Sequence, residues 1–311
     1  MKTRLQDQSG QAILMTVLFL TVLIGVAALT VDVGSWYRQQ RQAQATADAA
    51  ALAGAQVLPS DTVQAQTLAA QYATANGGIG AGGITLRSDF EPHDTVVVQV
   101  SKDVPSFFAN IFNIDHATVT ATAAARADVP NQVFRVAPIV VNQQLCDLKG
   151  CPGCPCFNSE TTLPLGKDGA PGAFGFVNLD GGNNGIGNLA DWIQNGYNGY
   201  LGLGGYPSDP GANFDSNGVL AALDARVATE LLFPVYDTLS GQGTNAQYDV
   251  IGWVGFHLDC VGTVTDGQCV NGHGNSDALT GYFTKVIWQG IQGTTDQHLP
   301  DFGAYSVELV N

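Results

Sequence analysis

The stretch that decides the fold is Ala12–Val31, AILMTVLFLTVLIGVAALTV, which contains no charged residue. Twenty helical residues at about 1.5 Å each match the roughly 30 Å hydrocarbon core of a bilayer. After Asp32 the chain continues into RQAQATADAAALAGAQV at positions 41–57, a run of strong helix formers. The sequence therefore predicts one helix from about Gln11 to Val57, whose first part spans a membrane.

A cleaved signal peptide is the alternative explanation of the apolar run. A secretory apolar region is about 7–15 residues long and ends at a small-residue cleavage site. The run here is longer, and no proline interrupts the helix formers after it until Pro59. We therefore expect a retained, single-pass anchor.

The charges beside the span do not orient it, because Lys2 and Arg4 precede it while Arg38 and Arg41 follow it. The composition of the whole chain is more informative. The chain has 6 cysteines, 38 glycines and only 13% charged residues, a composition that favours an oxidising, extracytoplasmic compartment. We expect the N-terminus in the cytoplasm and the bulk of the chain extracytoplasmic or at the cell surface.

The protein is strongly acidic, with a formal net charge of −15. From Asn131 onward there are 17 acidic and 5 basic residues. Such a surface repels phosphate backbones, which argues against a nucleic-acid partner. It also repels anionic lipids, so the C-terminal part is expected to stand away from the bilayer.

Small residues recur at every fourth position after the span, at Ala43, Ala47, Ala51 and Ala55. A helix face without bulk lets another helix approach its backbone closely. Alanine is also the best helix former, so the same stripe can reflect helix propensity alone. We predict packing against another helix and expect leucine at Ala47 or Ala51 to disturb it.

The segment 59–130 is expected to form a small α+β unit. Pro59-Ser60 ends the first helix, and Ser60 is the expected N-cap of a second helix that runs to Gly77. GGIGAGG at 77–83 is a turn signal. Strands are predicted at 95–101 and 117–123, with a short helix at 105–112 between them.

The segment 131–311 is expected to be a β-rich domain. Its strand and helix patterns are interleaved with glycine- and proline-rich loops. Strands are predicted at 133–141, 174–179, 231–235, 250–258, 281–291 and 305–310, and helices at 189–195 and 219–232. The fold class is therefore α+β, in three parts: a membrane helix with its alanine-rich continuation (1–58), the small unit (59–130) and the β-rich domain (131–311).

One set of residues resembles a known family. The set comprises Gly10-Gln11-Ala12, the span, Asp32-Val33-Gly34, Tyr37, Arg38, Arg41 and ADAAALAGA at Ala47–Ala55. In this order it resembles the TadE/TadG-like proteins of Tad-type (tight adherence) pilus and secretion systems. Looser similarity continues at 96–100, 107–108, 119–126, 175–180, 189–196, 210–211, 231–237 and 250–256.

The resemblance implies a non-enzymatic, pilin-like component of pilus assembly, anchored in the membrane. The implied partners are other pilus or secretion subunits, reached through the N-terminal helix in an oligomeric assembly. Type IV prepilins carry a glycine followed five residues later by a glutamate. Here Gly10 is followed by Met15 at that place, which departs from the pattern and leaves processing after Gly10 open.

The six cysteines form a cluster, Cys146, Cys151, Cys154 and Cys156, and a pair, Cys260 and Cys269. An even number in an oxidising compartment favours disulfides, although the cluster leaves zinc and thiol redox chemistry as alternatives. Asp266-Gly267 is a turn signal that brings Cys269 back toward the strand of Cys260. We predict that this pair is bonded, and that the cluster pairs within itself.

Asn213, Asp215, Asn217 and Asp224 imitate the ligand spacing of a calcium loop, with Gly218 at its sixth position. The first ligand is asparagine, and the glycine-rich stretch before it cannot form an entering helix. A simpler interpretation is that Asp215, Ser216 or Asn217 caps the helix from Val219. Calcium is therefore a weak candidate, and we expect no cofactor.

No catalytic set stands out. The chain lacks G-x-S-x-G, H-E-x-x-H and a phosphate loop, and its five histidines are scattered. His257 falls in a predicted strand as a core or edge residue. We therefore expect no enzymatic activity; an anchored extracytoplasmic enzyme or metal-binding module is the alternative.

Overall fold

The computed structural model describes residues 9–77, 83–145, 157–165, 174–182, 186–209, 214–241, 245–271, 278–293 and 299–310. The chain divides into two compact units. Unit 1 comprises Met1–Arg126 and Glu308–Asn311, and unit 2 comprises Ala127–Val307. The expected α+β class is confirmed, with a long N-terminal helix and a strand-rich C-terminal region.

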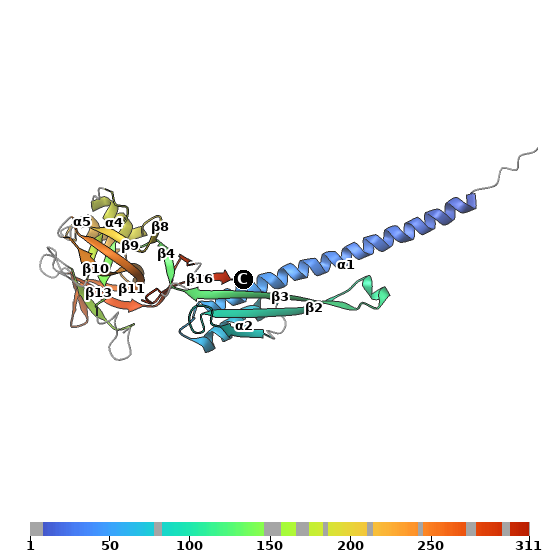
Figure 1. The fold of residues 1–311 in the computed structure, drawn as a ribbon, viewed down its shortest axis with the longest axis horizontal. Helices are drawn as coiled ribbons and strands as arrows, with labels where there is room; N and C mark the ends of the chain where they lie inside the picture. Colours follow the sequence, from blue (N-terminus) through green and yellow to red (C-terminus); the bar gives the residue numbers. More distant parts are fainter. Residues whose placement is uncertain are drawn as a thin grey trace, which may run out of the picture. The chain divides into compact units, whose positions relative to one another are not determined.

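Unit 1 is built on one long helix, α1, which covers Ser9–Ala55 (Figure 1). A short turn leads to α2, Thr62–Ala75, which packs against α1. The N-cap of α2 is Asp61, whose side chain accepts the N–H of Gln64 at 2.8 Å. The prediction that Ser60 caps this helix was wrong by one residue: a carboxylate fills the same role.

An antiparallel sheet completes unit 1. Strands β1 (Gly83–Arg87), β2 (Thr95–Pro105) and β3 (His116–Asp128) pair in this order. β2 and β3 form a long hairpin, in register from the pair Thr95–Arg126 to the pair Pro105–His116. At its tip lies a 3-10 helix, η1 (Ala109–Phe112), so the predicted helix at 105–112 is shorter than expected and β2 is longer.

Unit 2 holds two short helices and strands in two sheets. The helices are α4 (Ile186–Asn195) and α5 (Asn217–Asp224). The larger sheet contains β5 (Ile139–Asn142), β6 (Thr161–Pro164), β7 (Phe174–Val177), β9 (Gly204–Asp209), β10 (Thr229–Ser240), β11 (Gln247–Thr265), β12 (Gln268–Asn271) and β13 (Ala278–Thr284). The smaller sheet has the order β15 (Gly290–Gln292), β4 (Pro130–Phe134), β8 (Tyr200–Gly202).

The larger sheet closes on itself. Its order is β10-β5-β7-β9-β11-β13-β6, and β10 also pairs with β11, which makes a ring of five strands. β11 is long enough to take part in several pairings: β10 lies along one edge, while β9 and then β13 lie along the other. Two more strands, β14 (Val286–Ile287) and β16 (Ala304–Val310), pair in parallel and are not part of this sheet. The last residues of β16, from Glu308, belong to unit 1.

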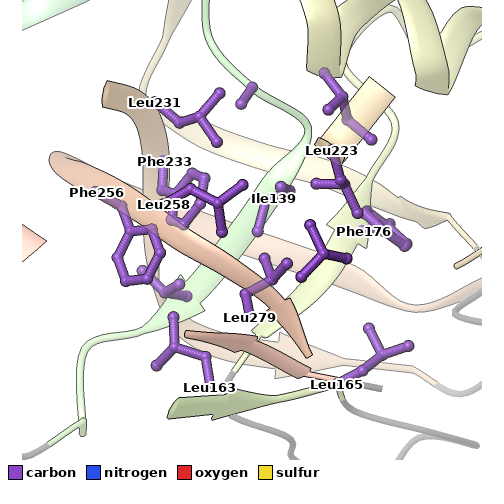
Figure 2. Close-up of a cluster of buried hydrophobic side chains, with 14 of the residues drawn as sticks. Ile139, Leu163, Leu165, Phe176, Leu223, Leu231, Phe233, Phe256, Leu258 and Leu279 are labelled. Carbon is purple, nitrogen blue, oxygen red and sulfur yellow. The ribbon is translucent and has the colours of Figure 1, made fainter. Parts of the chain in front are cut away.

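The core of unit 2 is aromatic and aliphatic. Phe233 of β10 stacks on Phe256 of β11 with ring centroids 5.1 Å apart. Figure 2 shows these rings with Leu258 near Ile139 of β5, and Phe176 of β7 near Leu223 of α5. Because α5 adds Val219, Ala222 and Leu223 to this core, it covers the sheet as an amphipathic helix should.

Several sequence boundaries were wrong in this unit. The predicted strand at 133–141 is split into β4 and β5, because Arg135 between them adopts φ 57°. Gly196 (φ 74°) ends α4 against this break, and a Cβ there would lie 2.6 Å from the Arg135 carbonyl oxygen. The predicted helix at 219–232 ends at Asp224, and the predicted strand at 281–291 is three short strands.

Candidate functional site

The helix α1 has two surfaces of different character along its length. From Ile13 to Val31 its large apolar side chains are all exposed to the surroundings of the single chain. Of the helices in the described residues, α1 is the one that is long and apolar enough to cross a membrane. From Ala43 onward, by contrast, the same helix buries one face in the core of unit 1.

Asp32 lies between the exposed and buried parts of α1 and is fully buried. Its Oδ1 accepts the backbone N–H of Phe107 at 2.8 Å. Its Oδ2 accepts those of Phe108 at 2.9 Å and Ala109 at 2.6 Å. One carboxylate thus satisfies three successive N–H groups at the start of η1, the way an N-cap satisfies the first turn of a helix. We call this arrangement the Asp32 clamp.

The hairpin tip is shaped to present these N–H groups to Asp32. The Ser106 N–H donates to the Asp115 carbonyl at 2.9 Å and closes the hairpin. Asn113 adopts the left-handed conformation with φ 59°, which ends η1 and turns the chain into β3. The sequence drew attention to Asp32 as part of a motif, but its partners lie 75–77 residues away and only the fold brings them together.

Further hydrogen bonds tie α1 to the hairpin beyond the clamp. The Gln40 Nε2 donates to the Thr120 carbonyl at 2.8 Å, and the Gln44 Nε2 donates to that of Thr122 at 3.3 Å. Lys102 on β2 donates to Gln39 at 3.0 Å. The hairpin is therefore fixed along α1 over several turns, and in Figure 1 it extends beside this helix past α2.

The alanine stripe lies inside unit 1. Ala43, Ala47, Ala51 and Ala55 are all buried, and so are Ala65, Ala69 and Ala73 on the facing helix α2. Gly54 marks the closest approach, since a Cβ there would lie 2.9 Å from the Ala65 carbonyl oxygen. Small residues on both helices allow this distance. Around the stripe, α1 packs against both α2 and β2 of the same chain.

The pair Cys260 and Cys269 is bonded in the structure, with a Cα–Cα distance of 5.6 Å. Asp266 and Gly267 both have positive φ and form the turn between β11 and β12 that brings the two sulfurs together. The four residues Cys146, Cys151, Cys154 and Cys156 lie outside the described residues. Their pairing therefore stays a prediction, as do the zinc and redox alternatives.

Replacing both Cys260 and Cys269 with serine should destabilise unit 2. Closing a loop of about ten residues restricts the unfolded chain by ~3 kcal/mol on the entropic model. Denaturant unfolding with and without reductant measures this loss in the wild-type chain. Non-reducing peptide mapping provides the direct check: a peptide that joins either residue to the first cysteine cluster would contradict the pairing.

The weak calcium candidate is only partly described, because Asn213 lies outside the described residues. Asp215, Asn217 and Asp224 are exposed. The hydroxyl of Ser216 accepts the Val219 N–H at 3.3 Å, so Ser216 is the N-cap of α5. Within the described parts of the chain, no three His, Cys, Asp or Glu side chains are grouped as metal ligands. Calcium binding here remains untested.

Three titratable side chains of unit 2, those of His257, Tyr236 and Tyr248, pack against aromatic neighbours. His257 on β11 lies 3.1 Å from the Glu230 carboxylate and stacks on Tyr282 with ring centroids 4.8 Å apart. Burial raises the pKa of Tyr236 and raises that of Tyr248 to about 12. These two rings meet edge to face at 4.8 Å and remain neutral at physiological pH.

Comparison with known proteins identifies the N-terminal segment. Residues 10–57 match the family model described as "Tad: Putative Flp pilus-assembly TadE/G-like". No curated protein and no solved structure is significantly similar to the chain. The match covers α1 and the turn after it, including Asp32 and the alanine stripe. It confirms the resemblance seen in the sequence and supports a component of pilus assembly.

Proposed function

We propose that this protein is a non-enzymatic, membrane-anchored, pilin-like component of a Tad-type pilus or secretion system. Its α1 crosses the membrane once, with the N-terminus in the cytoplasm and unit 2 outside. The observation that carries the proposal is that residues 10–57 match a pilus-assembly family model. These residues form a helix whose first part is apolar and exposed and whose second part contributes to the core of unit 1.

The two parts of α1 explain why the anchor should be retained. Removing a signal peptide leaves a mature chain that no longer needs the removed segment. Here the apolar run continues without interruption into the residues that pack against α2 and the hairpin. An anchor joined rigidly to its folded unit suits a subunit whose position relative to the membrane matters during assembly.

The partners we propose are other subunits of the same system, which contact the exposed apolar part of α1 within the membrane. The alanine stripe is already buried within unit 1, so it is a poor surface for a second subunit. The exposed part of α1 keeps its whole circumference available in the single chain. Within a bilayer such surfaces associate by close packing and not by the hydrophobic effect.

Intact-mass measurement of membrane-extracted protein should return a chain that still contains residues 12–31. We expect this because the anchor is the apolar part of α1 itself. A mature N-terminus near Leu29 would contradict the anchor, whereas one at Gln11 would reveal prepilin-type processing with the span kept.

Protease added outside intact cells should degrade unit 2, and protection of unit 2 would reverse the proposed orientation.

Co-purification tests the assembly role. From gently solubilised membranes the chain should bring down a pilus ATPase or inner-membrane platform proteins, identified by mass spectrometry. A variant in which Leu20 and Ile24 are both changed to alanine keeps the span apolar but removes bulk from its exposed surface. It should stay in the membrane and lose partners, while recovery of the same partners would argue against contact through this surface.

A further inference from the structure

The tip of the β2–β3 hairpin carries large apolar side chains that the single chain leaves uncovered. We call this set the apolar tip: Phe107, Phe108, Ile111, Phe112 and Ile114. Phe107 is 65% exposed, and Ile111 and Phe112 are 79% and 78% exposed. The segment Ser106–Ile114, SFFANIFNI, contains no charged residue. A cluster of this kind on a water-facing hairpin marks an interaction surface.

The Asp32 clamp fixes where this surface lies along α1. Asp32 is the first residue after the apolar span Ala12–Val31, whose twenty residues cover about 30 Å of helix. The three N–H groups that bind Asp32 belong to the first residues of the tip. The apolar tip is thus held at the level where α1 leaves the hydrocarbon core.

The backbone of the tip is suited to a medium with little water. The N–H groups of Ile111, Asn113 and Ile114 donate to carbonyls within the tip, and those of residues 107–109 donate to Asp32. Backbone groups without hydrogen-bond partners are strongly disfavoured in the hydrocarbon region, so a backbone bonded in this way is the kind tolerated close to it. The amides of Asn110 and Asn113 supply polar groups suited to the headgroup layer.

We propose that the apolar tip inserts into the membrane–water interface beside α1, as a second attachment of unit 1 to the same leaflet. The inference rests on the proposed anchoring of α1. The occupant of the tip is lipid, because the Asp32 clamp holds the tip beside the end of the span, where Leu29 and Val31 are also exposed. Apolar side chains at this depth bind by burial in the headgroup and acyl boundary.

A second attachment changes what the anchor does. A single helix can tilt and rotate in the bilayer, because its lipid-facing surface is the same all round. With the tip inserted, a tilt of α1 away from the tip would pull Phe107 and Phe112 out of the interface. The tip therefore sets which face of unit 1 is turned toward the membrane, and the Asp32 clamp transmits this constraint to α1.

The charge of the lipid headgroup should matter little for contact with the apolar tip. The protein as a whole is strongly acidic and is repelled by an anionic surface, whereas the tip itself is uncharged. Contact should therefore depend on apolar burial and not on the lipid charge. A partner protein docked on the same residues is the competing outcome, and a chemical probe placed in the tip separates the two.

The experiment uses the full chain with the photo-reactive residue p-benzoylphenylalanine in place of Phe112, reconstituted in phosphatidylcholine vesicles. After irradiation, mass spectrometry of the peptide reports whether the adduct is lipid or protein. The same probe at Leu20, within the span, is the positive control. The probe at Val63 is the matched negative control, since Val63 is an exposed apolar residue of unit 1 on α2, beside the far end of α1.

We expect lipid adducts at Leu20 and Phe112, with a yield at Phe112 several-fold above that at Val63. Adding phosphatidylglycerol should leave the yield at Phe112 unchanged. Lipid adducts at Leu20 without any at Phe112 would overturn the insertion of the tip and leave the anchor in place. An adduct between Phe112 and a second copy of the chain would overturn it in favour of a subunit contact. Absence of lipid adducts at Leu20 would remove the anchor and this inference together.

Discussion

Replacing Asp32 with alanine should release the hairpin tip from α1. The substitution leaves three N–H groups without their common acceptor, and hydrogen bonds to a charged group are stronger than those between neutral groups. The freed groups recover part of this loss by opening to water, so we expect the tip to open locally more often. Amide hydrogen exchange of the peptide 105–115 in detergent micelles should accelerate about 100-fold.

Asp103→Ala is the matched control for this experiment. Asp103 lies on the same hairpin, but it is exposed and accepts its hydrogen bond from the Thr118 hydroxyl of the neighbouring strand. Its removal should change exchange at residues 107–109 little, because exposed polar contacts contribute little to stability. Asp32→Asn should give an intermediate effect, since one amide oxygen still accepts. Unchanged protection of residues 107–109 in Asp32→Ala would show that the clamp does not hold the tip.

Replacing Gly54 with leucine should disrupt the packing of α1 on α2. Even the first carbon of the new side chain would lie 2.9 Å from the Ala65 carbonyl oxygen and 3.1 Å from the Ala69 Cβ. A backbone oxygen cannot turn aside as a flexible side chain can, so the two helices must separate. Overpacking typically costs 1–3 kcal/mol, and we expect ~3 kcal/mol or more here, measured as a fall in the free energy of unfolding of unit 1.

Gly34→Leu makes the same chemical change on the same helix at a position where a Cβ meets nothing within 4 Å. It should be neutral or stabilising by up to about 1 kcal/mol, because leucine is a better helix former than glycine. Equal effects of the two substitutions would refute close packing at Gly54. Leucine at Ala47 or Ala51 should behave like Gly54→Leu, because both alanines are fully buried against unit 1 itself.

This last point changes how the alanine stripe is understood. From the sequence, the stripe could meet any helix, including one from another subunit, or none. In the structure the stripe is buried within unit 1, where α1 packs against α2 and β2 of the same chain. A substitution in the stripe that weakens assembly would therefore act first on the folding of unit 1. Only substitutions on the exposed apolar part of α1 or at the apolar tip test contacts between molecules directly.

The sequence predicted best what depends on neighbours along the chain. The length of α1 follows from an uninterrupted run of helix formers, and the β11–β12 turn follows from Asp266-Gly267. The strands of the hairpin were predicted from their alternation, although both extend further than the pattern. The predicted element boundaries were wrong where tertiary contacts decide the backbone conformation. Arg135 is an example: its positive φ occurs where its backbone packs against Gly196, and arginine has no preference of its own for that conformation.

What the sequence by itself determined is therefore the α+β class, the long apolar helix, the match of residues 10–57 to a pilus-assembly family model and the acidic character that argues against nucleic acid. These are properties of composition and of local periodicity. Only the tertiary structure decided that Asp32, the first residue after the apolar span, holds the N–H groups of Phe107, Phe108 and Ala109. The physical reason is that a carboxylate is satisfied by any donors the fold brings within about 3 Å, and backbone N–H groups have no identity that a sequence pattern can reveal.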